Sequence, residues 1–346
     1  MSQGNRENNS VDGYFSVYLG SLRIDSVLDF DLYISVGHDL VLYRSANLPF
    51  TATTRDSLLE NKVTRLYVSA GDRHQFQQYV EANIRQILND PSVDEFTKAS
   101  IIYDSSKQLV EDLLSNPRLA ENIQRSQAMV ESTVMFILEG QSAFQNMVRV
   151  MSFDYSTYTH SVNVCTFALA LARFTGIERT EELNRLGTGA LLHDVGKTRI
   201  PESILNKQGP LTEDEMDIVR RHPQWGCEII QETDLISEES YFPILQHHER
   251  EDKTGYPNGI GSNDVHLFSK IVSIADVFDA MTTKRVYRHA VDTYPALKEM
   301  YSLIDGFDRR LLDQFTHLMG PIDRQLGVSG STSELVYPDR QSRQTE

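Results

Sequence analysis

Nearly every segment between residues 147 and 327 carries apolar residues at three- and four-residue steps, the spacing of one buried helical face. Residues 159–176 form a strongly apolar run that stops at a glycine. Residues 180–196 begin with acidic residues and also stop at a glycine, which are ordinary helix start and stop signals. This pattern predicts that the C-terminal half folds as an all-α helical bundle.

The N-terminal part has a different pattern. Short runs rich in β-branched and aromatic residues occupy residues 14–42 and 63–69, which predicts strands, and residues 53–59 read as a short helix. The expected unit is a small α/β domain over residues 13–92. It contains no Gly-rich phosphate loop. Only its position before the bundle suggests a regulatory role, as a sensor or a site for a regulatory protein partner.

Helical spacing returns in residues 93–146, which we interpret as a helical linker. These helices could support a homodimer, or they could simply pack on the neighbouring domain. The polar ends, residues 1–12 and 328–346, are expected to be disordered tails. The predicted fold class is therefore α+β: a small N-terminal α/β domain, a helical linker and a C-terminal helical bundle.

Composition limits the possible functions. The formal net charge of −16 argues against binding a nucleic-acid polymer, which requires a basic surface. No run of about 18 apolar residues predicts a membrane span, and the N-terminus lacks an apolar signal core, so we expect a cytoplasmic protein. The only cysteines, Cys165 and Cys227, form no CxxC pair and are expected to be small buried packing residues.

Histidines and acids interrupt the apolar helical pattern at a few positions. His193 and Asp194 are adjacent at a predicted helix end, in HDVGK, where both side chains could reach one cavity and Lys197 could add a cation. Imidazole and carboxylate ligands suit Mn, Fe, Co, Ni or Zn. We expect His222 in the middle of the helix opened by the Thr212 capping box, where Pro223 would disturb the hydrogen-bond ladder.

Three further contexts hold polar side chains that need partners if buried. They are the pair His247 and His248, Asp276 within an apolar helical run, and His160 at the start of residues 159–174. Each residue alone is more often an ordinary core or surface side chain. Asp279 is interpreted as a helix-surface acid. Four other histidines are not expected to bind a metal: His38, which precedes Asp39 in an expected turn, His266, His289 and His317.

Taken together, these segments resemble the HD-GYP family, a branch of the HD phosphohydrolase superfamily. The matching text over about residues 147–320 is HDVGKTRIPESILNKQGPLTEDE, RRHPQWGCEII, QHHEREDKTGYPNGI, IADVFDAMTTKRVYR and FDRRLLDQF. The HDxGK motif indicates only the superfamily. The HHE motif followed by GYP narrows the resemblance to the branch, and it places an HD-GYP phosphodiesterase domain at residues 147–327.

The resemblance implies an all-α bundle that holds two, sometimes three, divalent transition metal ions. Fe or Mn would be expected, with Co, Ni or Zn as alternatives. The first ion would be held by His160, His193, Asp194 and Asp276. The second would be held by His222, His247 and His248, with Asp194 bridging both. Two such ions would neutralise a phosphate group and make hydroxide available near pH 7.

The resemblance also implies the substrate, because family members cleave cyclic di-GMP, a bacterial second messenger, to the linear dinucleotide pGpG and some continue to GMP. Asp194 and Lys197 would be the catalytic residues, with Lys197 stabilising charge. The remaining contacts to substrate would come from Gly255, Tyr256, Pro257, Arg285 and Arg288. Both arginines could instead lie on a solvated helix end.

Three positions depart from the family pattern. Ser156 stands where members with a third metal ion have glutamate, which predicts a two-metal site. Asn163 stands where many members have arginine, and Lys253 replaces a usual glycine before GYP. The main hypothesis is an active cyclic di-GMP phosphodiesterase regulated by its N-terminal domain. The alternatives are a catalytically weak cyclic-dinucleotide-binding signalling module and a phosphodiesterase for another cyclic dinucleotide, such as cyclic GMP-AMP.

Overall fold

A computed structural model describes residues 13–151, 156–283, 291–303 and 306–325 of the 346-residue chain. Both predicted tails lie outside these ranges, and so do Arg285, Arg288 and His289. Within the described residues, no helix is both long enough and apolar enough to cross a membrane.

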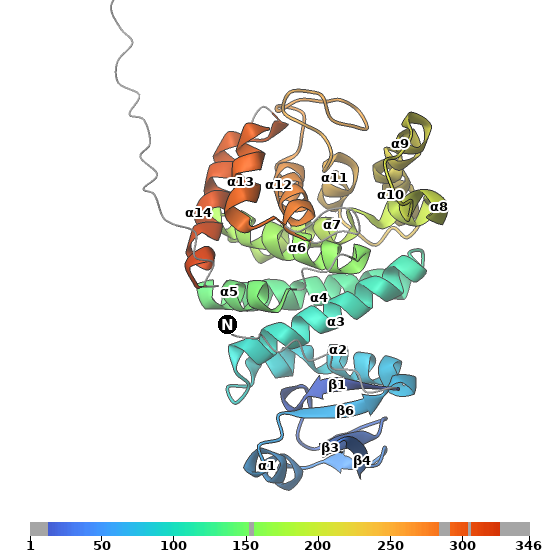
Figure 1. Ribbon diagram of the computed structural model, residues 1–346, viewed down its shortest axis with the longest axis vertical. Coiled ribbons are helices and arrows are strands. Elements are labelled where there is room, and N and C mark those ends of the chain that lie inside the picture. Colours follow the sequence, from blue (N-terminus) through green and yellow to red (C-terminus); the bar gives the residue numbers. More distant parts are fainter. Residues whose placement is uncertain (1–12, 152–155, 284–290, 304–305, 326–346) are drawn as a thin grey trace, which may run out of the picture.

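The predicted strands form a four-stranded sheet at one end of the molecule, with the order β1-β6-β3-β4 (Figure 1). The strands are β1 (Tyr14–Tyr18), β3 (Leu32–Val36), β4 (Asp39–Arg44) and β6 (Arg65–Ser69), and a small second sheet pairs β2 (Ser26–Val27) with β5 (Pro49–Phe50). All pairings are antiparallel, so this unit is α+β in type and not the alternating α/β unit that we expected. His38 lies in the turn between β3 and β4, as predicted.

Two helices accompany the sheet. The short helix α1 (Ala52–Glu60) is capped by Thr51, whose hydroxyl accepts a hydrogen bond from Thr54 N–H. The longer helix α2 (Arg73–Asn89) was not identified in the sequence. Its Phe76 and Tyr79 pack against both the apolar core of the sheet and the core of the helical region, so α2 joins the two.

The predicted linker folds as three helices, α3 (Glu95–Ser115), α4 (Ala120–Leu138) and α5 (Gln141–Val150). They form a layer between the sheet and the remaining helices (Figure 1), and their apolar faces belong to the same core cluster as α6 and α12. Arg125 of α4 fastens this layer, because its guanidinium donates to Glu81 of α2 and to Asp112 of α3. The three helices also pack onto the C-terminal half, where α3 and α5 contact α6, and α4 contacts α6 and α7.

The C-terminal half is helical, as predicted, with a short 3-10 segment after the second helix. Its elements are α6 (Thr157–Phe174), α7 (Thr180–Leu192), η3 (Val195–Arg199), α8 (Glu202–Leu205), α9 (Glu213–Val219), α10 (His222–Gln231), α11 (Glu238–Gln246), α12 (Leu267–Thr282), α13 (Thr293–Ser302) and α14 (Arg309–Gln325). Helix α6 packs against α7 and α12, and α11 packs against α7 and α12. Phe167, Phe278 and Phe315 meet edge to face and close the core between α6, α12 and α14.

The predicted position of His222 in the middle of a helix is wrong. The capping box of Thr212 and Glu215 does open a helix, but that helix ends at Val219, and His222 begins the next one, α10. Pro223 lies in the first turn of α10, where its missing N–H has no intrahelical acceptor to lose. The break between α9 and α10 therefore accommodates the proline without disturbing a ladder.

Candidate metal centre

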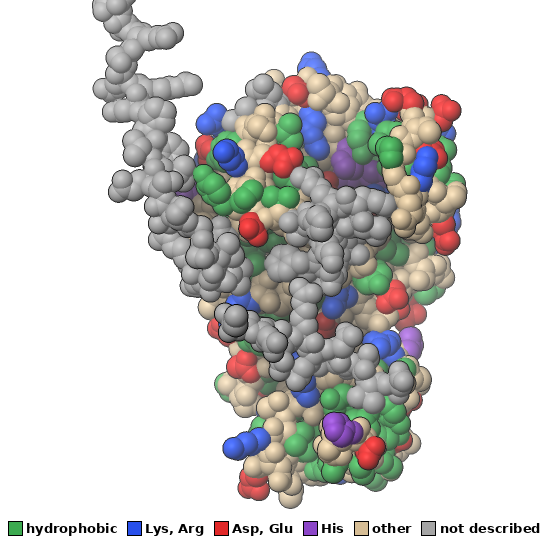
Figure 2. Space-filling view, in the orientation of Figure 1, with side chains coloured by type: hydrophobic (Ala, Val, Ile, Leu, Met, Phe, Trp, Pro, Cys, Tyr) green, Lys and Arg blue, Asp and Glu red, His purple; other side chains and the backbone are tan. Residues whose placement is uncertain are grey.

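Most of the predicted ligands lie at helix ends that meet at one buried position. His160 lies in the first turn of α6, His193 and Asp194 directly follow α7, and His222 begins α10. The pair His247 and His248 directly follows α11, and Asp276 comes from the middle of α12. All seven predicted ligands therefore come together, although they are spread over 117 positions of sequence. Figure 2 shows histidine side chains recessed in a hollow of the helical end.

The ligands form two groups. His160, His193 and Asp194 offer one set of atoms within 4.8 Å of one another, and His222, His247 and His248 offer another. Except for His248, which is partly buried, all of these residues are buried. Asp276, the fourth ligand expected for the first ion, is in neither group of three, but its Oδ1 lies 3.1 Å from His160 Nε2.

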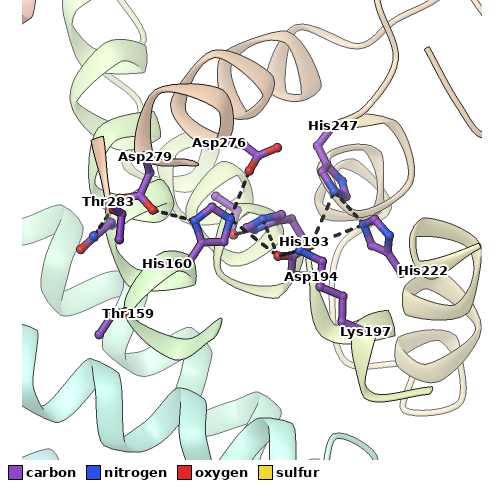
Figure 3. Close-up of polar contacts among 12 residues, drawn as sticks. Thr159, His160, His193, Asp194, Lys197, His222, His247, Asp276, Asp279 and Thr283 are labelled. Carbon is purple, nitrogen blue, oxygen red and sulfur yellow. Dashed lines mark hydrogen bonds and ion pairs between the residues drawn. The ribbon is translucent and has the colours of Figure 1, made fainter. Parts of the chain in front are cut away.

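Asp194 lies between the two groups and presents a different oxygen to each. Its Oδ2 lies 3.6 Å from His160 Nε2 and 3.4 Å from His193 Nε2, whereas its Oδ1 lies 3.4 Å from His222 Nε2 and 3.8 Å from His247 Nε2 (Figure 3). A carboxylate in this orientation can give one oxygen to each of two ions.

Backbone carbonyls orient three of the imidazoles. Nδ1 lies 2.7 Å from Ala190 O in His193, 2.7 Å from Val219 O in His222 and 2.8 Å from Pro243 O in His247. Because a carbonyl oxygen only accepts, each Nδ1 carries the proton and donates. Each Nε2 then carries a lone pair and no proton, and those of His222 and His247 lie 3.1 Å apart. This is the arrangement that prepares histidine to bind a metal.

The electrostatics keep these ligands in metal-binding states. Burial lowers the pKa of His222 to about 4 and holds the pKa values of His247 and His248 well below the usual range, so all three are neutral at pH 7. Burial opposes the charge of Asp194, but Lys197 and the neighbouring histidines hold its pKa well below the usual range. The His222, His247 and His248 group thus offers neutral imidazoles, and the carboxylate of Asp194 beside it is ionised.

Asp279 was misread as a surface acid. It is buried, with 1% of its surface exposed, and its Oδ2 lies 2.6 Å from His160 Nδ1. Its other oxygen accepts from Asn163 Nδ2 at 2.8 Å and from the Thr283 hydroxyl at 3.1 Å. Asp279 therefore orients His160 as the carbonyls orient the other histidines, but with a negative charge.

Orphaned polar atoms test whether these residues fit a metal ion. Among the described residues, His193 Nε2 and Asp194 Oδ1 are buried and have no hydrogen-bond partner. Such atoms cost free energy when they are left unsatisfied. Both face the cavity, and both belong to the imidazole and carboxylate types that bind divalent transition metals. The residues therefore fit divalent metal ions.

Lys197 lies on the short η3 segment, and its Nζ is 2.5 Å from Asp194 Oδ2. This segment can approach α10 only because residue 196 is glycine. A Cβ at Gly196 would lie 1.9 Å from His222 O and 2.6 Å from Gly226 N. The glycine of HDVGK thus allows the His222 backbone to contact the Asp194 segment, which brings the two ligand groups together.

The GYP loop lies against the second ligand group. The Tyr256 ring stacks on His248 with the ring centroids 4.6 Å apart, and Tyr256 N–H donates to His248 O. A Cβ at Gly255 would lie 2.4 Å from that same oxygen, so the loop needs glycine there. Pro257 follows a cis peptide bond. The structure therefore places Tyr256 beside the candidate metal centre.

Glu249 anchors this loop, a role that the sequence analysis missed although it quoted the HHE motif. Glu249 is buried, and its two carboxylate oxygens accept from Asn258 N–H at 2.7 Å and from Ile260 N–H at 3.1 Å. Arg250 beside it donates to Ser273 on α12 at 2.7 Å. The available signal was an acid directly after two proposed ligands, but no local pattern indicates that residues 258 and 260 are its partners.

The departures from the family pattern have local structural roles. The Ser156 hydroxyl caps α6, in a capping box with Thr159. Asn163 links Asp279 to Tyr103, whose hydroxyl donates to Asn163 Oδ1 at 3.0 Å. Lys253 takes a left-handed backbone conformation, with φ of 67°, where the usual glycine would be unstrained.

The other histidines and the cysteines take ordinary positions. His266 caps α12 and stacks on Phe242, and His317 is exposed on α14. Cys165 is buried, as predicted, whereas Cys227 is only partly buried.

Comparisons with known proteins match the region that holds this site. Residues 142–311 match a family model described as an HD domain. The chain is 33% identical over 230 residues to the cyclic di-GMP phosphodiesterase PA4108 of Pseudomonas aeruginosa, which covers 66% of this chain and 55% of that protein. It is 40% identical over 155 residues to the cyclic di-GMP phosphodiesterase response regulator RpfG of Xanthomonas campestris, covering 44% of this chain and 41% of that protein.

A third relative and one solved structure are also similar to this chain. The 3'3'-cGAMP-specific phosphodiesterase 2 of Vibrio cholerae is 29% identical over 233 residues, covering 67% of this chain and 42% of that protein. The solved structure of Bd1817, described as a HDG"Y"P protein from Bdellovibrio bacteriovorus, superposes with a TM-score of 0.61 at 23% identity, covering 89% of this chain and 99% of that one. This last likeness concerns the fold alone.

These matches support the HD-GYP family that the sequence resemblance implied: residues 142–311 are an HD domain, and the relatives named above are cyclic dinucleotide phosphodiesterases. The chain spans about half the length of the curated relatives that it matches.

Proposed function

We propose that this chain is a two-metal-dependent phosphodiesterase that hydrolyses cyclic di-GMP to linear pGpG, with further cleavage to GMP as a slower step. The observation that carries the proposal is the orientation of Asp194, with one oxygen toward each of two histidine groups. A binding module would not need such an arrangement, whereas phosphodiester hydrolysis by two ions does. The names of the relatives support this substrate class.

The seven proposed metal ligands would divide between the two ions. His160, His193, Asp194 and Asp276 would hold one ion, and His222, His247 and His248 the other, with Asp194 shared. Fe or Mn is the proposed metal. Together the ions would neutralise the phosphate and make hydroxide available near pH 7.

Lys197 would stabilise charge on the phosphate, since its ammonium already lies against the shared carboxylate. The Tyr256 ring, stacked on His248, would offer a flat surface to a guanine base, and Gly255 and Pro257 set its position. Arg285 and Arg288 remain proposed phosphate contacts from the sequence alone.

A second substrate is worth testing because one relative is named a 3'3'-cGAMP-specific phosphodiesterase and matches 67% of this chain. The two substrates differ in one base, so Tyr256 would stack on either. The contacts that would distinguish guanine from adenine are therefore the deciding feature.

A product assay tests the proposal. The purified chain is reconstituted with Fe(II) or Mn(II) and given cyclic di-GMP, 3'3'-cyclic GMP-AMP or cyclic di-AMP, while metal content is measured in parallel. We expect pGpG from cyclic di-GMP at the highest rate. Tight binding of cyclic di-GMP by a two-metal protein without any cleavage would favour the binding module instead.

The proposal includes regulation through residues 13–92 and a homodimer through residues 93–146. Most apolar side chains of α3, α4 and α5 are buried within one chain, so a dimer would use their outward faces, which carry the exposed Phe96, Leu119 and Met135. Light scattering of the intact chain would test this, and a monomer at micromolar concentration would reject it.

A further inference from the structure

A cavity of about 480 Å³ lies where the sheet region meets the helical region, away from the metal centre. Its walls come from β1, β6, α2 and α3, from Ser21 and from the first turn of α6. The volume lies within the usual range for small-molecule sites. Segments that are far apart in sequence therefore surround one space.

Two guanidinium groups of this cavity lack acidic partners. Arg65 of β6 donates to the Ser16 hydroxyl at 3.2 Å and to the Tyr18 hydroxyl at 2.6 Å, and Arg73 of α2 lies 4.2 Å from the centre of the Phe15 ring. Among the described residues, neither arginine makes an ion pair with a carboxylate. Two cations without a carboxylate partner therefore line one cavity.

The rest of the wall combines flat rings with polar groups. Phe76 and Tyr158 contribute aromatic rings, and Gln77 and Gln108 contribute amides. Lys107 is paired with Asp104 at 2.9 Å, and Glu111 accepts from Gln108 at 3.2 Å, so the acids lie together on the α3 side. Arginines would bind a phosphate, rings would stack on a base, and acids and amides would accept from hydroxyl or amino groups.

We propose that this cavity is a binding site for a small phosphorylated molecule with a planar ring, of the size of a mononucleotide, distinct from the metal centre. Its phosphate contacts Arg65 and Arg73, and its ring lies among Phe15, Phe76 and Tyr158. The site goes beyond the proposed phosphodiesterase activity and does not depend on it.

The cavity is also linked to the metal centre by short contacts. Its wall includes Thr159, the residue before the ligand His160. Helix α3 forms another wall, and its Tyr103 begins a continuous series of hydrogen bonds to Asn163, Asp279 and then His160, with lengths of 3.0, 2.8 and 2.6 Å. A ligand that restrains α3 and the first turn of α6 therefore acts on the segments that position His160.

Calorimetric titration tests the site, with AMP, GMP and inorganic phosphate as probes of the metal-loaded chain. We expect AMP or GMP to bind more tightly than phosphate, and Arg65→Gln/Arg73→Gln to weaken binding at least about tenfold. The matched control is Arg85→Gln/Arg179→Gln, which removes the same charge from exposed surface positions. Arg73→Gln alone removes no hydrogen bond to the protein among the described residues, so it tests the site without risk to folding.

Asp194→Ala separates the two sites. Nucleotide binding at the cavity should persist in this variant, whereas binding at the metal centre should not. Hydrogen exchange on adding AMP should slow in α3 and in residues 157–163. The proposal is overturned if neither nucleotide binds at millimolar concentration, if both arginine variants bind like the control, or if Asp194→Ala abolishes binding. None of these outcomes depends on catalytic turnover.

Discussion

The Nδ1 atom of His160 and the Oδ2 atom of Asp279 lie 2.6 Å apart in the buried core between α6 and α12. Burial opposes a charge on His160, but hydrogen bonds to Asp276 and Asp279 raise its pKa to about 10. An ion at this position must therefore displace a proton from His160. The same contact to Asp279 makes the imidazole a better electron donor once the proton has left.

Asp279→Asn should lower metal affinity or turnover about 10- to 100-fold, the usual effect of removing such an outer carboxylate. The amide cannot satisfy the site in either orientation. One orientation sets its NH₂ against the His160 N–H, and the other sets it against the donors of Asn163 and Thr283. Elemental analysis and initial rates check this. Asp217→Asn, an exposed acid on α9, is the control and should behave as wild type. Equal metal content and rate in both variants would contradict the role of Asp279.

The contrast between Asp276 and Asp279 shows how much of the site could be predicted from the sequence. The resemblance to the HD-GYP family implied all seven proposed ligands, although each residue alone was weak evidence. Asp279 was not among them, and three residues after Asp276 a helix can present an acid either to solvent or to another helix. Its neighbours Phe278 and Met281 are both buried. Apolar residues all around a helix indicate burial on every side, and that signal was available.

Long-range contacts explain most of what the sequence did not reveal. Glu249 has its acceptor role only because residues 258–260 fold back over it. Helix α2 has a mostly polar composition, and its partners lie in the sheet on one side and in α3 on the other. The strands were predicted from short runs rich in β-branched and aromatic residues. Their antiparallel order depends on pairings between residues 14–18 and 65–69, which no local pattern records.

Asp194→Ala should remove both ions and abolish turnover, because one carboxylate faces both groups. Elemental analysis of protein purified with added Mn or Fe checks this. His317→Ala, an exposed histidine on α14, is the control and should keep both ions. Two ions per chain in Asp194→Ala would refute the shared role.

Lys197→Ala should lower kcat about 10- to 100-fold while both ions remain bound, the size expected when one charged group that stabilises a transition state is lost. Its ammonium lies at the edge of the site and is 18% exposed, so its removal leaves the ligands in place. The comparison variant is Lys207→Ala, which breaks only the pair with Glu215 outside the site. A parallel loss of metal and activity would make Lys197 a structural residue.

Asp90 should govern the acid stability of the joint between the sheet and α2. Burial raises its pKa, but hydrogen bonds from Ser92 and Arg23 dominate and lower it to about 2. A depressed carboxyl pKa stabilises the fold above the unfolded value of 3.8, and that contribution is lost as the pH falls from about 4 toward 2. Asp90→Asn should cost about 1–2 kcal/mol at pH 7, allowing for partial solvent screening.

Urea unfolding between pH 7 and pH 3 measures this difference. The gap between wild type and Asp90→Asn should be constant near neutrality and should narrow on the acid side. Asp39→Asn, an exposed acid at the start of β4, serves as the control. A gap that does not change with pH would mean that the ionised carboxylate is not what stabilises the joint.

Glu249→Gln should raise the KM for cyclic di-GMP about tenfold, which corresponds to about 1.4 kcal/mol, with metal content unchanged. The carboxylate now accepts two backbone N–H groups of residues 258 and 260, whereas glutamine offers one oxygen and sets its NH₂ against the other donor. The loop that places Tyr256 on His248 then loses an anchor, but the histidines keep their own carbonyl partners. Steady-state kinetics with Glu202→Gln, an exposed residue of α8, as the control separate this loop effect from a general loss of folding. An unchanged KM with a reduced kcat would place Glu249 in the chemistry and not in the position of the loop.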